Sequence, residues 1–304
     1  MPVALAYLAV IMIWSTTPLA IQWSGQEVGP YFGLALRMLI GLGLLLVVVR
    51  VLRLSLPMQR PALRVYLTGG LPLFIAMTSV YWSAQFIPSG WIAVIFALTP
   101  FLTGLFSRVL LHQRSFTASK SLGLLLALGG LVTVFYESLS LASLAWAGLL
   151  GVCMAATVHS LGAVLLKQLR SSIHPISITA GSLLVATPLF VLHSLCYGLP
   201  DTMPTQALGA IVYLAVMGSA IGFPLYYFCL DRLSPEQVAL ITLVTPVLAL
   251  ILGATLNGEW ISARVWTGSV LILLGLAVFE YGRRWPALWR RITTRHAAAD
   301  VGAD

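Results

Sequence analysis

Ten apolar segments, each long enough to cross a lipid bilayer, make up most of this chain of 304 residues. A membrane-spanning helix needs about 20 predominantly apolar residues, and irregular backbone is not tolerated against lipid. Charged residues are only 9% of the chain, whereas water-soluble domains carry roughly 25%. We therefore expect an all-α integral membrane protein with ten transmembrane helices. Their expected ranges are 3–23, 31–52, 64–85, 89–111, 119–136, 144–169, 174–197, 208–231, 236–256 and 263–281.

The lysine and arginine residues predict the orientation of the chain. If the N-terminus lies in the cytoplasm, 15 of the 17 basic residues fall on the cytoplasmic side, as the positive-inside rule requires. The two exceptions are Arg37, inside the second segment, and Arg264, at the outer start of the tenth. We therefore predict a multi-pass protein of the bacterial inner membrane with both termini in the cytoplasm. Residues 283–304 are expected to form a basic cytoplasmic tail that either lies on the anionic leaflet or is solvated.

The net charge of +8 would suggest nucleic-acid binding if the protein were soluble. Here the basic residues form short clusters between apolar segments, where an anionic lipid leaflet attracts them. The expected partners are therefore membrane lipid and a small-molecule solute, not nucleic acid, and both a monomer and a homodimer stay open. The three cysteines lie within apolar segments without CxxC spacing, so we predict neither a metal site nor a cofactor.

An internal duplication relates the two halves of the chain. A shift of 146 residues brings the third and fourth segments onto the eighth and ninth, and the Thr-Pro pairs at 99–100 and 245–246 then coincide. Each half has five segments, an odd number, so the second half crosses the membrane in the opposite orientation. We predict two inverted five-helix repeats, 1–137 and 144–282, which in known transporters rock about a solute site near the midplane. A duplication with a purely structural role is the alternative.

Several motifs occur in the order typical of one group of transporters. They are Trp14-Ser15 in the first segment, Arg37 in the second, the Thr-Pro pairs at 99–100 and 245–246, the NGEW stretch at 257–260, and Gly268 with Gly275. With its five-plus-five layout, the chain resembles the drug/metabolite transporter superfamily, and more narrowly its EamA-type family of bacterial metabolite exporters. The resemblance implies export of amino acids, other metabolites or drugs, although some members import solutes. The family often carries Glu just after the fourth segment, where this chain has Gln113, so a role that needs paired acidic residues is not expected.

Polar and aromatic side chains recur at helical spacing in the third, fourth and ninth segments. A face of this kind avoids lipid and lines either a solute cavity or a contact between helices. For the aromatic residues we favour a cavity wall, because bulky rings at matching positions of two repeats suit an apolar pocket with a few hydrogen bonds. The predicted substrate-binding residues are Trp14, Arg37, Thr78, Tyr81, Trp82, Thr99, His159, Tyr226, Tyr227, Thr242 and Thr245.

Arg37 and His159 are the charged and titratable candidates inside the membrane. Arg37 lies six residues after Tyr31, about 9 Å below the outer end of its helix. It therefore needs a facing acceptor, a freed carbonyl or an anionic substrate, unless it is a structural clamp or extends to the interface. His159 could carry a proton, although a hydrogen-bonded histidine in a core is the commoner case.

Three prolines, Pro18, Pro100 and Pro246, lie well inside apolar segments. Each removes an N–H and frees the carbonyl four residues earlier, which is tolerable only toward protein or a wet cavity. Bendable walls of a solute path and passive kinks for packing explain these prolines equally well.

The predicted function is secondary transport of a small metabolite by alternating access, with export of amino acids or related compounds as the first candidate. Arg37 would bind a carboxylate, the aromatic residues a side chain, and Thr or carbonyl oxygens an ammonium. An uptake carrier or a drug-efflux carrier of the same family would need the same features. An intramembrane enzyme is not expected, because the five histidines are scattered and neither HExxH nor GxSxG occurs.

Overall fold

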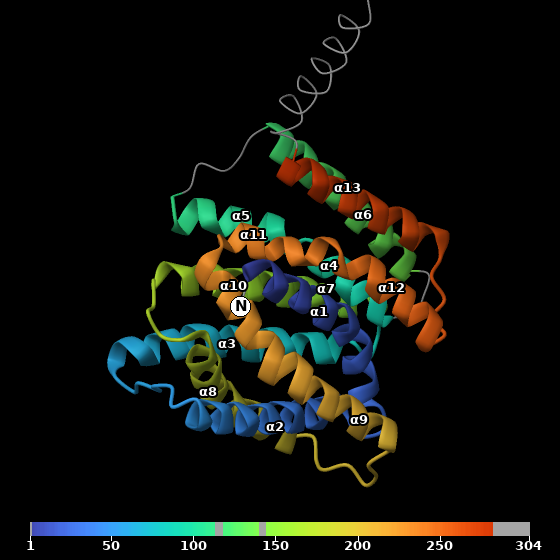
Figure 1. Ribbon diagram of the computed structural model, residues 1–304. Coiled ribbons are helices and arrows are strands. Elements are labelled where there is room, and N and C mark those ends of the chain that lie inside the picture. The colour runs from blue at the N-terminus through green and yellow to red at the C-terminus, as the bar shows by residue number, and fades with distance from the viewer. Residues whose placement is uncertain (1, 113–117, 140–143, 282–304) are drawn as a thin grey trace, which may run out of the picture.

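The computed structural model describes residues 2–112, 118–139 and 144–281, which form a bundle of helices without a strand (Figure 1). The helical elements are α1 (Val3–Gly25), α2 (Pro30–Val51), α3 (Arg60–Ser83), α4 (Ser89–Phe96), α5 (Thr99–Leu110), α6 (Ala118–Leu139), α7 (Ala145–Gln168), α8 (Pro175–Leu195), α9 (Thr205–Tyr213), the π-helix η1 (Leu214–Gly222), α10 (Phe223–Arg232), α11 (Pro235–Ala239), the 3₁₀ turn η2 (Leu240–Leu243), α12 (Thr245–Leu256) and α13 (Ala263–Tyr281). The predicted basic tail, 283–304, lies outside the described residues, as does Gln113.

Among the described residues, eight helical stretches are long and apolar enough to cross a membrane. Shorter apolar stretches lie in α6, over Ser119–Val134, and in α13, over Ala263–Phe279. Large apolar side chains face outward on these helices, among them Val51 at 71% exposed, Leu125 at 67% and Val132 at 66%. A continuous surface of this kind is stable against lipid and not against water. These features confirm the predicted all-helical, multi-pass membrane protein.

Hydroxyl side chains inside the bundle bond mostly to their own helices. Ser15 donates to the carbonyl oxygen of Ile11 at 2.7 Å, and Ser79 donates to that of Ile75 at the same distance. Bonds back to residue i−4 satisfy polar groups that have no water beside them inside a membrane. Ser and Thr can therefore occupy buried helix contacts without a tertiary partner.

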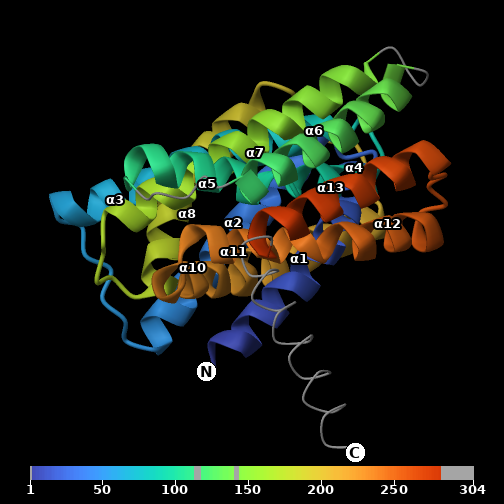
Figure 2. The same cartoon turned by 90° about the horizontal axis from the view of Figure 1, so that it is seen from above.

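Most of the helices lie roughly alongside one another in both views (Figures 1 and 2). α6 and α13 form one edge and make the most extensive helix contact among the described residues. α2 and α8 pack together at the opposite edge, and α3 packs against both α7 and α8. α1 lies in the middle, in contact with α4, α10 and α12, so helices from both halves of the chain enclose the centre.

Two segments that we expected as single helices, 89–111 and 236–256, are each broken near the middle. In both, the second helix begins at the threonine of a Thr-Pro pair, so the proline lies in the first turn, where no intrahelical hydrogen bond is lost. Apolar length alone could not reveal the breaks. The hydroxyl of Thr99 donates to the carbonyl oxygen of Phe96, so the carbonyl that we expected Pro100 to free toward protein or a wet cavity is used within the chain.

The segment expected over 208–231 is one helical stretch with a change of geometry. α9 and α10 flank nine residues, Leu214–Gly222, that are wound as a π-helix. Gly218 in this π-helix leaves room for Arg37 of α2, because a Cβ at Gly218 would lie 2.7 Å from the Nη2 atom of the arginine. π-helical turns are rare and frequently occur at functional sites.

Glycine permits the close contact between α6 and α13. A Cβ added at Gly130 would meet the backbone oxygen of Gly268, and one added at Gly123 would meet that of Gly275. The two backbones therefore touch at both positions, as small residues allow in membranes.

Replacing Gly130 with leucine should disrupt this contact, whereas the same change at the neighbouring Gly129 should not. Gly129 faces open space, with no atom within 4 Å of an added Cβ. Overpacking costs about 1–3 kcal/mol, so we expect Gly130→Leu to lower the midpoint of thermal unfolding in detergent and Gly129→Leu to leave it unchanged. Equal midpoints for the two variants would show that the contact is not close-packed.

Candidate functional site

A central cavity of about 80 Å³ lies between helices from both halves of the chain. Its wall is mostly apolar and comes from α1, α2, α3, α4, α7, α10, η2 and α12. Apart from the indole of Trp14, the polar side chains that line it are Thr17, Arg37, His159, Thr242 and Thr245. An apolar pocket with a few placed polar groups is the usual form of a small-molecule site.

Arg37 is the charged residue of the central cavity, and it is 1% exposed. Its Nε donates to the hydroxyl of Ser219 at 3.1 Å, and its Nη1 donates to the hydroxyl of Tyr81 at 3.3 Å. The guanidinium carbon lies 6.0 Å from the ring centre of Phe223. None of these partners is charged, and no carboxylate among the described residues pairs with Arg37.

An aromatic cluster of Trp14, His159, Tyr226 and Tyr227 lies beside the central cavity. The ring centre of Trp14 is 5.8 Å from that of His159 and 5.1 Å from that of Tyr226. The rings of His159 and Tyr226 are 5.3 Å apart, and those of Tyr226 and Tyr227 are 5.5 Å apart. The cluster joins α1, α7 and α10, so a small movement of any of these helices would change the opening between them.

Two further cavities continue from the centre toward the ends of α7 and α10. An intermediate cavity of about 30 Å³ shares His159 and Phe223 with the central cavity. A surface cavity of about 280 Å³, here named the basic mouth, shares Leu166 and Tyr227 with the intermediate cavity. The basic mouth is lined by Leu166, Lys167, Arg170, Ser171, Ile178, Tyr227, Leu230 and Asp231.

A cavity of about 380 Å³, here named the amide mouth, lies on the other side of the centre. It shares Ile21 with the central cavity, and Tyr81 in its wall is the hydroxyl partner of Arg37. The side chains of Gln22, Gln26, Gln85 and Asn257 give it its polar lining. The four cavities thus follow one another through shared wall residues, with the Arg37–Tyr81 pair between the amide mouth and the centre and the aromatic cluster between the centre and the basic mouth.

The loop after α12 forms a clasp beside the amide mouth. The Glu259 carboxylate accepts hydrogen bonds from the backbone N–H groups of Ser89 at 3.1 Å and Gly90 at 3.3 Å, at the start of α4. The Asn257 amide donates to Glu259 at 3.0 Å and to the side-chain oxygen of Gln22 at 2.9 Å. A carboxylate is favoured at a helix N-terminus, where N–H groups are unpaired and the helix dipole is positive. The clasp therefore ties α1, α4 and the α12–α13 loop together at this end.

The structure places the predicted site residues in three positions. Trp14, Arg37, His159, Thr242 and Thr245 line the central cavity. Tyr226 and Tyr227 line the intermediate cavity, and Tyr81 lines the amide mouth. The remaining three residues, Thr78, Trp82 and Thr99, line none of these four cavities.

Trp82 and Thr99 have partners of their own away from the cavities. The ring of Trp82 is 5.0 Å from that of Phe86 and lies against Gly151 of α7, where an added Cβ would be 3.0 Å from its Cε3. The backbone carbonyl of Thr99 accepts a hydrogen bond from Ser160 at 3.4 Å. Both residues therefore lie at helix contacts.

The sequence prediction missed Thr17, Phe223, Lys167 and Arg170. Thr17 follows Trp14 by three residues and so lies on the same helix face, a signal that the sequence contained. Phe223 precedes the predicted Tyr226 by three residues and Tyr227 by four within α10, so the same signal was present for it. Within the described part of the chain, no three His, Cys, Asp or Glu side chains come close enough to hold a metal ion.

Known proteins resemble this chain over most of its length. The uncharacterized transporter YoaV of Bacillus subtilis is 24% identical over 288 residues, which cover 93% of this chain and 98% of that protein. The uncharacterized inner membrane transporter YedA of Escherichia coli is 27% identical over 290 residues, which cover 93% and 92%. A probable amino-acid metabolite efflux pump of Escherichia coli is 28% identical over 178 residues, which cover 54% and 58%.

The fold and the family profile agree with these relatives. A solved crystal structure of a protein with 23% identity matches this fold with a TM-score of 0.72 and covers 93% of this chain and 98% of its own. The profile of the EamA-like transporter family matches residues 1–136 and 146–281. Both halves of the chain are therefore matched, and this protein belongs to the EamA-like transporter family, as its motifs predicted.

Proposed function

We propose that this protein is a secondary transporter that exports amino acids or related small metabolites bearing a carboxylate, by alternating access. The observation that carries the proposal is the series of four cavities through the bundle, with the guanidinium of Arg37 near its middle. Alternating access needs a solute site near the midplane, between two halves that rock about it.

The charge of Arg37 supports a solute with a carboxylate. A buried cation without a counter-ion costs several kcal/mol, and residues of this kind mark substrate pathways in membranes. The partners of Arg37 are the neutral hydroxyls of Ser219 and Tyr81. A carboxylate in the central cavity would supply the missing charge, and it can bind the planar guanidinium with two parallel hydrogen bonds.

Two threonines supply the complementary group for an ammonium. The hydroxyl of Thr17 donates to the carbonyl of Ile13 at 2.7 Å, and that of Thr242 donates to the carbonyl of Ala239 at 2.7 Å. Because each hydroxyl hydrogen is already used, these oxygens can act toward the cavity only as acceptors. A cation at one point and acceptors at others suit the two charges of an amino acid.

The bounds of the helices support two inverted five-helix repeats, 1–137 and 144–282. α5 spans Thr99–Leu110 and α12 spans Thr245–Leu256, so α12 begins and ends 146 residues after α5 does. The breaks before these helices recur at the same offset. Five crossings in each half would invert the second repeat relative to the first.

The contact between α6 and α13 has the symmetry that such repeats require. An offset of 145 residues converts Gly123 into Gly268 and Gly130 into Gly275. The contact between Gly123 and Gly275 therefore becomes the contact between Gly268 and Gly130, and both occur. A two-fold relation between the halves accounts for this exchange.

We further propose an inner-membrane location with both termini in the cytoplasm, so that the basic mouth faces the cytoplasm and the amide mouth the outside. YedA is named an inner membrane transporter. Lys167 and Arg170 line the basic mouth, whereas neither Lys nor Arg lines the amide mouth. This distribution follows the positive-inside rule.

Export is favoured over uptake by a relative that is named a probable amino-acid metabolite efflux pump. Pockets for drug-sized ligands measure about 300–1,000 Å³, whereas the central cavity measures about 80 Å³, which favours a small metabolite over a drug. Rings surround His159 in the cavity, and among the described residues no hydrogen bond joins it to a nucleophile, so this geometry does not favour a catalytic function.

The deciding experiment measures accumulation of labelled solutes in bacterial cells with and without the protein. The panel contains amino acids with their toxic analogues, and a matched set of L-phenylalanine, 3-phenylpropionate and phenethylamine. Lower accumulation of solutes that bear a carboxylate, with phenethylamine unchanged, is the expected result. Export of phenethylamine alone would contradict the role of Arg37, and no difference for any solute would contradict transport.

Reporter fusions should place residues 140 and 304 on opposite sides of the membrane. We expect alkaline phosphatase, which is active only outside the cytoplasm, to be active after residue 140 and inactive after residue 304. Green fluorescent protein should give the reverse pattern. Phosphatase activity at residue 304 would overturn both the ten-helix count and the proposed orientation.

Substitutions of Arg37 should separate charge from hydrogen-bond geometry. Arg37→Lys keeps the charge and loses the planar fork, so it should keep partial activity, whereas Arg37→Gln should weaken solute binding about tenfold or more. Arg50→Gln removes a charge from an exposed position of the same helix and should have no effect. The measurement is solute affinity of purified protein, with the amount inserted in the membrane as control. Wild-type affinity in Arg37→Gln, or failure of this variant to insert, would make Arg37 a structural clamp.

Removing the charge of Glu259 should loosen the clasp at the amide mouth. Glu259→Gln has nearly the same shape but loses charge-assisted hydrogen bonds, each of which contributes about 1.5–3 kcal/mol. With the natural cysteines replaced by alanine, we expect an Ile21→Cys reporter to react about tenfold faster with an impermeant maleimide added outside. Glu27→Gln, an exposed change at the same end, should leave the rate unchanged. Equal rates in both variants would show that the clasp does not control opening.

A further inference from the structure

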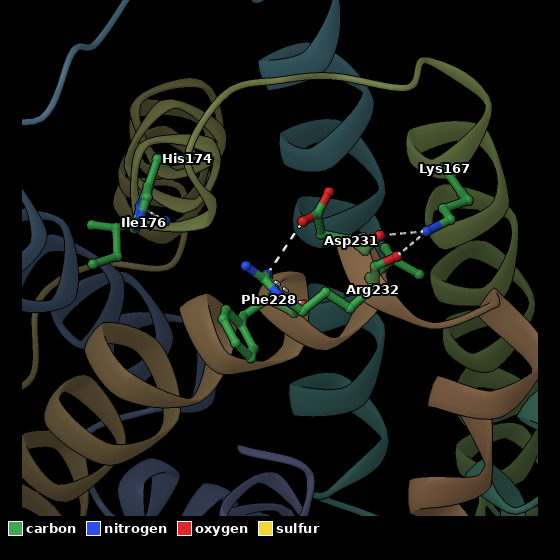
Figure 3. Close-up of polar contacts among 7 residues, drawn as sticks. Lys167, His174, Ile176, Phe228, Asp231 and Arg232 are labelled. Carbon is green, nitrogen blue, oxygen red and sulfur yellow. Dashed lines mark hydrogen bonds and ion pairs between the residues drawn. The ribbon is translucent and has the colours of Figure 1, made fainter. Parts of the chain in front are cut away.

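The basic mouth carries more positive charge than its surroundings neutralise. Lys167 reaches from α7 to the end of α10, where its Nζ donates to the backbone carbonyls of Leu230 at 2.6 Å and Asp231 at 2.8 Å (Figure 3). A lysine is favoured at a helix C-terminus because the last carbonyls are unpaired and the helix dipole is negative there. Lys167 therefore has a structural role, and the helix end offsets only part of its charge.

The carboxylate of Asp231 is engaged with a different cation. Its Oδ2 pairs with Nη1 of Arg232 at 3.2 Å (Figure 3). Arg232 also donates to the carbonyl of Phe228 at 3.4 Å, and its guanidinium lies 3.8 Å from the centre of the Phe228 ring. Asp231 and Arg232 thus neutralise each other, and Arg232 does not line the mouth.

Arg170 lines the mouth as an exposed cation with no charged partner among the described residues. Across the ranges that the structure describes, its guanidinium has no hydrogen bond or ion pair. Its backbone has a φ of 45°, a conformation that glycine or asparagine adopts more easily. The next side chain, Ser171, accepts a hydrogen bond from the N–H of Ile173 at 3.1 Å, which leaves its own O–H free to donate. A cation and a hydroxyl donor therefore stand together on the wall.

The basic mouth adjoins the cavities that lead to Arg37. It shares Leu166 and Tyr227 with the intermediate cavity, which in turn shares His159 with the central cavity. An anion bound at Arg170 would therefore lie at one end of this series of cavities, with Arg37 further along it. A lipid phosphate stays at the bilayer surface and would not need a connection to Arg37, so the connection favours a solute as the ligand.

We propose that Arg170 and the Ser171 hydroxyl form a capture site for the anionic group of the solute. The ligand is a small carboxylate or zwitterion, which binds at the mouth through its carboxylate before it moves to the central cavity. This capture site rests on the proposed transport function, because the solute that binds at the mouth is the one that then enters the series of cavities. Arg170 supplies the charge, and Ser171 supplies a neutral donor.

The test uses an Ile178→Cys reporter on the wall of the mouth, in a chain whose natural cysteines, Cys153, Cys196 and Cys229, are alanine. In phosphatidylcholine vesicles, the measurement compares the labelling rate of an anionic methanethiosulfonate (sulfonatoethyl) with that of a cationic one (trimethylammonioethyl). We expect the anionic reagent to be favoured, and Arg170→Gln to lower this preference about threefold to fivefold, as one nearby unit charge predicts. Arg53→Gln is the matched control, because Arg53 is exposed, has a similar φ of 51° and does not line the mouth, and it should leave the preference unchanged.

Protection of the reporter identifies the ligand. We expect 3-phenylpropionate to slow labelling when Arg170 is present and not in Arg170→Gln, and phenethylamine to have no effect on either. Equal losses of preference in Arg170→Gln and Arg53→Gln would overturn the site, because general surface potential would then explain the result. In vesicles that contain phosphatidylglycerol, loss of both the protection and the difference in preference between the unsubstituted protein and Arg170→Gln would also overturn it, because a lipid phosphate would then be the occupant.

The labelling pattern separates the site from the transport function. If the pattern is found and the accumulation screen shows no transport, the anion site stands and the proposed function fails. If solutes are exported and 3-phenylpropionate does not protect the reporter, the capture site fails and the transport function stands.

Discussion

Hydrocarbon offers no hydrogen-bond partner, and this constraint shapes the whole structure. Each unpaired polar group in lipid costs several kcal/mol, so the backbone must be helical wherever it meets the membrane interior. The same cost explains why hydroxyls such as Ser15 and Ser79 bond back to their own helices. The departures from regular helix, at the Thr-Pro breaks and at the π-helix, adjoin the central cavity, whose wall includes Phe96, Phe223 and Thr245.

The two ends of the path are held by different interactions. At the amide mouth, the Glu259 carboxylate binds backbone N–H groups of α4, so a side chain of the second half holds a helix of the first. At the basic mouth, Lys167 binds the last carbonyls of α10, and Arg170 has a free charge. A carboxylate on a helix start and a lysine on a helix end obey one electrostatic rule with opposite signs. At the amide mouth, the Glu259 charge is used within the protein. At the basic mouth, Lys167 is used in the same way, and the neighbouring Arg170 remains available to a ligand.

Part of the site could be predicted from single side chains. Trp14, Arg37 and His159 were expected at a cavity because polar or aromatic groups at this depth avoid lipid, and all three line the central cavity. Tyr81 and Trp82 were expected on one wall, yet successive residues of a helix point about 100° apart. Tyr81 accordingly faces Arg37, whereas Trp82 faces α7.

The amino-acid sequence was enough to predict that the chain crosses a membrane many times and belongs to its family, because apolar length, basic clusters and motif order are properties of local stretches. Which side chains meet depends instead on how the helices pack. Arg37 binds Ser219, 182 residues away, and the Ser89 amide binds Glu259, 170 residues away. Such pairs depend on how far each helix rotates and how closely it approaches its neighbour, and glycines and a π-helix set these quantities here. Periodicity along one segment contains no record of the helix that will face it, so the cavities and the free charge of Arg170 appear only when the bundle is assembled.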